Sequence, residues 1–68
     1  MAHRAPQVIS PEQLESRAGY NRTMREVDTL TRALMGQWDA ATDQRRQDLI
    51  ARSREQFDAT VALGGGRF

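Results

Sequence analysis

The apolar repeat between Tyr20 and Ala41 is the feature that most limits how this chain can fold. Apolar or small side chains recur there at alternating spacings of four and three residues, with polar side chains between them. This spacing is typical of a helix with one apolar face, which has to be covered by another element or another molecule. The repeat consists of Tyr20, Met24, Val27, Thr31, Leu34, Trp38 and Ala41, and is widened by Leu30 and Met35.

A second strong signal marks the start of a helix at Pro11. Ser10 can cap the helix by accepting a hydrogen bond from the backbone of Gln13, and proline is favoured at the first helical position. Ile9 and Leu14 stand where a hydrophobic staple places its two apolar residues. These signals agree on one starting point. They predict architecture and carry no chemistry.

The pattern is interrupted at Gly19. Thr23 followed by Glu26 forms a second capping box, which favours a break or kink just before it. We therefore expect separate helices over about 11–18 and 23–39. The alternative is one helix that continues through Gly19, at a cost of about 1 kcal/mol relative to alanine.

A further helix is expected over about 43–63. Thr42 is a candidate N-cap, and Asp43 in the first turn complements the helix dipole. Three successive glycines, 64–66, end this helix because they lose too much backbone entropy to stay helical. Its apolar stripe is narrow, which suits packing against one neighbour. The stripe consists of Leu49, Ile50, Phe57 and Val61.

The expected fold is all-α: a helical hairpin of two long amphipathic helices, with a short N-terminal helix and extended or flexible tails. The domain plan is an extended tail over 1–9, a helical domain over 10–63 and a glycine-rich tail over 64–68. We interpret Trp38 as part of the seam between the long helices, with an exposed partner anchor as the alternative. Phe68 has no local core to join, and both a docking role and a disordered end stay open.

The small size of the chain indicates that it needs help to fold. A core within 68 residues supplies only about 3 to 5 kcal/mol unless a disulfide, a metal or a neighbouring chain contributes. There is no cysteine, and the one histidine is His3. A protein partner or a homo-oligomer is therefore expected, and no cofactor or metal.

Charge is nearly balanced, and all ten basic residues are arginines. Arginine suits phosphate recognition, but these arginines are spread among acids, for example Asp28 with Arg32 and Asp48 with Arg52 at helical spacing. We therefore interpret them as solvated faces, and do not expect a nucleic-acid partner. The sequence shows neither a span of about 18 apolar residues nor the apolar core of a signal peptide. We expect a cytoplasmic protein, or one inside a virus particle.

No catalytic constellation is visible. The serines at 10, 16 and 53 have no base at a recognisable spacing, and there is no cysteine nucleophile. Pairs of acids one turn apart, such as Glu12 with Glu15 and Asp39 with Asp43, lack the further ligand that a metal needs. The glycines at 64–66 leave a helix and are followed by no lysine, so they do not form a phosphate-binding loop. We expect a protein that is not an enzyme.

The last twenty residues or so resemble the closing helix of outer-membrane efflux channel proteins. The resemblance rests on Leu49, Ile50, Gln56 and the run Val61, Ala62, Leu63 and 64–66 with an aromatic residue close behind. It needs about one helical turn deleted before Ala62, so it does not assign the chain to that family. What it implies is a helix that lies beside others in a tube or ring and ends in a flexible glycine segment.

Two classes of function follow. The first is a small structural or assembly subunit that packs its helices and tails onto its own copies or onto a larger complex, such as a virion tail or another tube-like assembly. The second is a dimeric DNA-binding or antitoxin-like regulator that uses Arg45, Arg46, Arg52 and Arg54 on phosphates. We favour the first, because acids interleave those arginines. Its predicted partner-binding residues are Met24, Val27, Leu30, Leu34, Trp38, Leu49, Ile50, Phe57, Val61 and Phe68.

Overall fold

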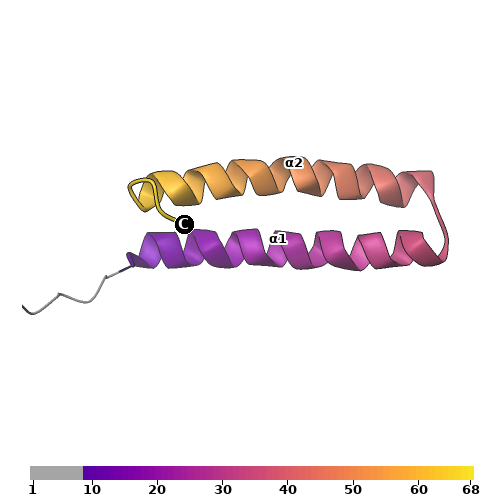
Figure 1. Ribbon diagram of the computed structural model, residues 1–68, viewed down its shortest axis with the longest axis horizontal. Helices are drawn as coiled ribbons and strands as arrows, with labels where there is room; N and C mark the ends of the chain where they lie inside the picture. Colours follow the sequence, from indigo (N-terminus) through magenta and orange to yellow (C-terminus); the bar gives the residue numbers. More distant parts are fainter. Residues whose placement is uncertain (1–8) are drawn as a thin grey trace, which may run out of the picture.

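Two long helices lie side by side and antiparallel in the computed structural model, which describes residues 9–68 (Figure 1). The first helix, α1, spans Pro11–Gly36, and the second, α2, spans Ala40–Leu63. Strands are absent from residues 9–68. The predicted all-α hairpin is therefore confirmed, while the extended tail predicted over 1–9 falls almost entirely outside the described residues.

α1 begins where the sequence predicts and then continues without the predicted break. The Ser10 hydroxyl accepts a hydrogen bond from the backbone N–H of Gln13 (3.1 Å). The separate short helix over 11–18 is wrong, because α1 runs straight through Gly19. Thr23 does not cap a new helix. Its hydroxyl donates to the carbonyl of Gly19 (3.1 Å), a bond made inside a continuous helix.

α1 ends at Gly36, three residues earlier than predicted, and Asp39 starts α2. The Asp39 carboxylate accepts hydrogen bonds from both the backbone N–H and the hydroxyl of Thr42, each at 2.8 Å. Thr42 was the predicted N-cap, but its hydroxyl is used as a donor to the acid. The helix therefore starts at Ala40 instead of Asp43.

The seam between the helices follows a repeat of three and four residues on both of them, the spacing of left-handed helix packing. Among residues 9–68, the buried apolar side chains are Val27 and Leu49, whose exposed fractions are 7% and 9%. Most other seam positions carry polar groups. The buried or half-buried seam residues are Gln13, Ser16, Tyr20, Thr23, Val27, Leu30 and Leu34 on α1, and Thr42, Arg46, Leu49, Ser53, Gln56 and Thr60 on α2.

Polar groups in the seam are satisfied mainly by bonds within one helix. The hydroxyls of Ser53 and Thr60 each donate to a carbonyl of α2 at 2.7 Å, and Thr60 also meets the Ser16 hydroxyl of α1. Within the described chain, Arg46 Nε and Gln56 Oε1 are buried without a hydrogen-bond partner. A buried polar atom without a partner destabilises a protein by about 1 to 3 kcal/mol. These two atoms therefore reduce the stability that the seam provides.

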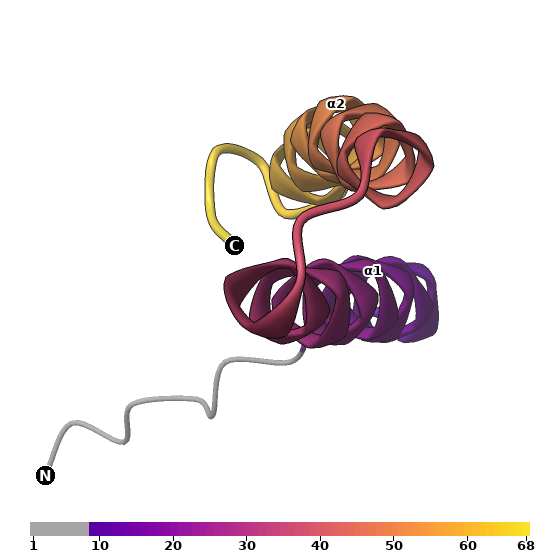
Figure 2. The ribbon, with the colours of Figure 1, turned by 90° about the vertical axis from the view of Figure 1, so that its right-hand side faces the viewer.

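After α2, the chain folds back onto one side of the hairpin (Figure 2). Gly65 and Gly66 adopt φ of 63° and 98°, which side chains disfavour. The Gln13 amide of α1 then donates to the carbonyl of Arg67 (2.8 Å). The glycines end the helix as predicted, but residues 64–68 make defined contacts with both helices and do not hang free.

Neither helix of residues 9–68 is long and apolar enough to cross a membrane.

Candidate protein-interaction surface

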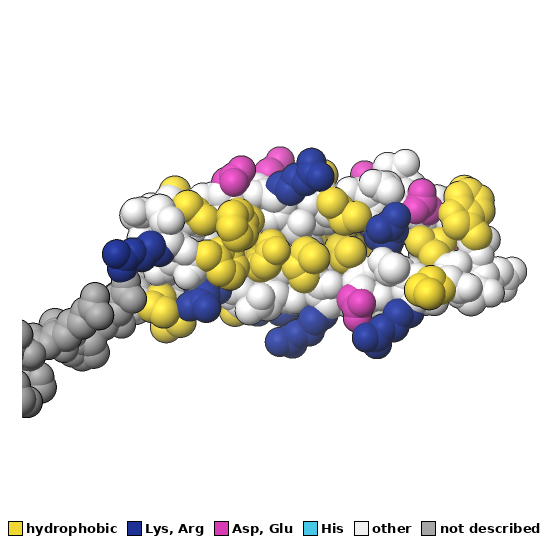
Figure 3. Space-filling model, in the orientation of Figure 1, with side chains coloured by type: hydrophobic (Ala, Val, Ile, Leu, Met, Phe, Trp, Pro, Cys, Tyr) yellow, Lys and Arg dark blue, Asp and Glu magenta, His cyan; other side chains and the backbone are white. Residues whose placement is uncertain are grey.

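One face of the hairpin carries a band of hydrophobic side chains over both helices (Figure 3). On α1, Met24 and Met35 are eleven residues apart, and on α2, Ile50 and Phe57 are seven apart. Both spacings return to the same side of a helix. We call this side the apolar face. It consists of Tyr20, Met24, Met35, Trp38, Ile50, Phe57, Val61 and Phe68.

Much of the apolar face is open to solvent. The exposed fraction is 37% for Met24, 83% for Met35 and 67% for Trp38. The interpretation of Trp38 as a seam residue is therefore wrong. Because α1 ends at Gly36, Trp38 lies in the connection between the helices, where the helical repeat no longer directs it into the seam.

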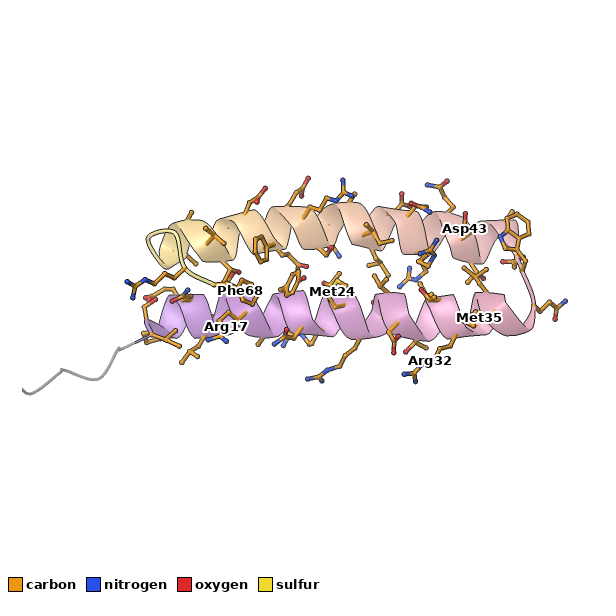
Figure 4. The ribbon with its side chains drawn as sticks, in the orientation of Figure 1. Arg17, Met24, Arg32, Met35, Asp43 and Phe68 are labelled. Carbon is orange, nitrogen blue, oxygen red and sulfur yellow. The ribbon has the colours of Figure 1, made fainter. Side chains whose placement is uncertain are left out.

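Three aromatic rings meet at the end of the face nearest the tail. Tyr20 of α1 and Phe57 of α2 have ring centroids 5.8 Å apart, and Phe68 packs edge-on to Tyr20 at 5.2 Å. Arg17 lies 5.5 Å over the Phe68 ring, a cation–π geometry (Figure 4). Phe68 therefore packs against Tyr20 of α1 and Phe57 of α2. It adds a residue of the tail to the apolar face.

Two shallow hollows flank the band. Near the aromatic rings, a hollow of about 260 Å³ is bordered by Tyr20, Phe57, Arg54 and Asp58. Near the connection, a second hollow of about 240 Å³ is lined by Thr31, Leu34, Met35, Trp38, Asp43 and Arg46. Each hollow combines apolar walls with charged groups at the edge. This combination suits a protein surface.

A third hollow, of about 510 Å³, lies at the tail end of the hairpin. It is bordered by Ile9 and Ser10 at the start of α1 and by Gly64, Arg67 and Phe68 on the returning tail. Ile9 is partly exposed there, at 36%. This hollow adjoins the aromatic rings at Phe68, and its lining is mainly polar.

The arginines do not gather into one basic stripe. Arg45 pairs with Glu26 across the helices, and Arg46 pairs with Asp43 at 3.4 Å. Arg54 instead borders the hollow beside Phe57. Four arginines proposed for phosphate contact are thus divided between different sides of α2, and two of them are neutralised within the chain.

Of the two helical ion pairs predicted from the sequence, one forms. Arg32 lies 2.9 Å from Asp28, as predicted. Asp48 instead accepts a hydrogen bond from the Gln44 amide at 2.9 Å. Both are exposed contacts, which contribute little to stability.

The predicted partner-binding residues divide into two groups. Val27 and Leu49 are buried in the seam, with Leu30 and Leu34 half-buried beside them, so these four contact the other helix. The remaining six lie on the apolar face, and their contact with a partner stays a prediction. They are Met24, Trp38, Ile50, Phe57, Val61 and Phe68.

Two contributors to this surface were missed as partner residues. Met35 was recognised only as part of the helical repeat, although its spacing from Met24 places both on one face. Arg17 had no local signal, because its contact is with Phe68 at the other end of the chain. Across residues 9–68, no three His, Asp or Glu side chains gather closely enough to hold a metal ion.

No protein-family model, no curated protein and no solved structure matches this chain.

Proposed function

We propose that this protein is a small non-enzymatic assembly subunit that binds protein through its apolar face. The observation that carries the proposal is the band of exposed hydrophobic side chains along one side of the hairpin (Figure 3). Exposed apolar residues scattered singly are normal on soluble proteins, whereas a contiguous patch rimmed by charges marks an interaction site.

The composition of the face supports a protein partner over a small ligand. Aromatic rings, methionine and arginine are the side chains enriched at the centres of protein interfaces, and Trp38, Phe57, Met24 and Arg17 supply them here. The two hollows beside the band, of about 260 and 240 Å³, are open and smaller than a typical small-molecule pocket.

The test is the mass of the purified chain by light scattering over a wide range of concentrations, with helicity recorded on the same samples. An oligomer of fixed size supports the proposal, and so does a poorly helical monomer, because both mean that the apolar face needs a cover. The proposal would be contradicted if the chain were a fully helical monomer at every concentration and if Met24→Glu and Phe57→Glu left its stability unchanged.

The DNA-binding alternative draws no support from the arrangement of the arginines. Arg45 and Arg46 are both paired with acids of the same chain. Binding to DNA that falls steeply with added salt would restore that alternative, since the steepness reports the number of phosphates contacted.

A further inference from the structure

We infer that the apolar face is covered by a second copy of this chain, packed antiparallel, so that the connection end of one hairpin lies over the tail end of the other. The result is a four-helix bundle. This inference rests on the proposed function and names the partner of the same surface.

The need for a cover comes from the weakness of the seam. Within residues 9–68, Val27 and Leu49 are the buried apolar side chains, and Arg46 Nε and Gln56 Oε1 are buried without hydrogen-bond partners. Chains of this size depend on a metal, a disulfide or association when their core is small. Another copy is present wherever the chain is made, and its face carries the same unburied apolar side chains.

The area of one side of the hairpin matches what a stable dimer requires. α1 has 26 residues. At 1.5 Å per residue it is about 39 Å long, and two adjacent helices are roughly 20 Å wide. The side that carries the apolar face, its polar positions included, therefore offers about 780 Å² per copy, close to the roughly 800 Å² that each partner contributes to a standard interface.

Hollows lie at both ends of the face. One of about 260 Å³ adjoins Tyr20 and Phe57 at the tail end, and one of about 240 Å³ adjoins Met35 and Trp38 at the connection end. A two-fold axis across the helices places opposite ends of the two copies over each other, whereas an axis along the helices would place like ends together.

The charges favour the antiparallel orientation. The tail end of the face carries Arg17 and Arg54 against one acid, Asp58. At the connection end Asp43 and Arg46 pair with each other, and Asp39 of the connection is a further, exposed acid. The antiparallel arrangement therefore brings an excess of arginine at one end toward an excess of acid at the other, which also favours one register of the two copies.

This geometry places Ile50 near the two-fold axis. Ile50 lies seven residues from Phe57 at one end and seven from Asp43 at the other. When Phe57 of one copy lies over Asp43 of the other, Ile50 meets Ile50 of the second copy. Because the chain has no cysteine, one engineered thiol reports this contact without background.

The experiment is disulfide formation in Ile50→Cys under mild oxidation, with helicity checked in the reduced protein. We expect at least tenfold more linked dimer than for Arg52→Cys, the matched control, whose side chain is two residues away and points to another side of α2. Light scattering of the unmodified chain should give twice the monomer mass. Phe57→Asp should shift it to monomer, while Arg52→Asp should not.

Each other outcome overturns the inference in a recognisable way. An oligomer whose Ile50→Cys variant links no faster than the Arg52→Cys control contradicts the antiparallel arrangement. A poorly helical monomer contradicts the second copy as partner but leaves the proposed function standing. A stable helical monomer that is indifferent to Phe57→Asp removes both.

Discussion

The ring of Phe68 stacks on the ring of Phe57, with centroids 4.9 Å apart and 18° between the ring planes. This contact joins Phe68 to the C-terminal part of α2, and Tyr20 adds α1 to the same cluster. The tail is thereby part of the hairpin surface.

The first prediction concerns this stack. Phe68→Ala should lower the free energy of unfolding by about 1 kcal/mol, because aromatic pairs contribute about 0.5 to 1.5 kcal/mol beyond their buried area. Urea denaturation measures the loss. Leu14→Ala, at an exposed position of α1, is the control and should change stability by less than about 0.5 kcal/mol. Equal losses in both variants would mean that the stack contributes nothing.

The second prediction compares two glycines. A Cβ at Gly64 would lie 2.2 Å from both the Arg67 carbonyl oxygen and the Gln13 amide nitrogen, whereas a Cβ at Gly36 meets nothing within 4 Å. Gly64→Ala should therefore displace the tail and break the bond from Gln13 to Arg67. We expect faster hydrogen exchange over 65–68 and a loss of about 1 kcal/mol. Gly36→Ala should leave the exchange unchanged. A protected tail in Gly64→Ala would show that the close approach is dispensable.

The third prediction tests the continuity of α1. A Cβ at Gly19 would lie 3.7 Å from the Gln56 amide nitrogen, an ordinary contact. Gly19→Ala should raise the free energy of unfolding by about 1 kcal/mol, because alanine loses less backbone entropy in a helix than glycine does. Thermal unfolding with helicity as the signal measures it. Destabilisation would instead indicate a break or kink at this position.

The fourth prediction is a dependence on pH. The hydroxyl of Thr42, and then its backbone N–H, hold the pKa of Asp39 below its ordinary value of 3.8. A lowered folded-state pKa means that the ionised cap stabilises α2 above about pH 3.8 and that this stabilisation is lost as pH falls through the lower value. Asn at this position can also cap but does not titrate.

Melting temperatures of the unmodified protein and of Asp39→Asn, followed from pH 7 to pH 2, check this prediction. The gap between the two proteins should narrow as the pH falls below about 3.8. A gap that stays constant over the whole range would show that the charge of Asp39 does not strengthen the cap.

Local signals predicted the start of α1 and the end of α2 correctly, because each depends on residues within one helical turn. Ser10 has no competing partner, and Gly64 is followed by two glycines with positive φ. The break at Gly19 was wrong because Thr23 can serve either as a cap or as a donor to its own helix. The packing of α2 along the whole of α1 decides between these uses, and that packing is not a local property.

The surface was harder to predict than the fold. Trp38 fits the repeat of α1, but α1 ends at Gly36, so Trp38 lies in the connection and outside the seam. The segment that carries Phe68 is held by the hydrogen bond from Gln13 to Arg67, which are 54 residues apart in the chain. Contacts over such separations have no signature in a single sequence. The apolar character of the face was visible in the spacing of Met24 and Met35, but its shape was not.

The connection between the helices, residues 37–39, also dictates the order in which the hairpin can form. Glu26 and Arg45 close a loop of 19 residues, whereas Ser16 and Thr60 are 44 apart. Loop-closure entropy grows with length, so contacts nearest the connection form first and pairing then proceeds toward Gln13 and Arg67. Unfolding of the hairpin follows the reverse order. The end that holds the aromatic rings is therefore the last to form and the first to fray.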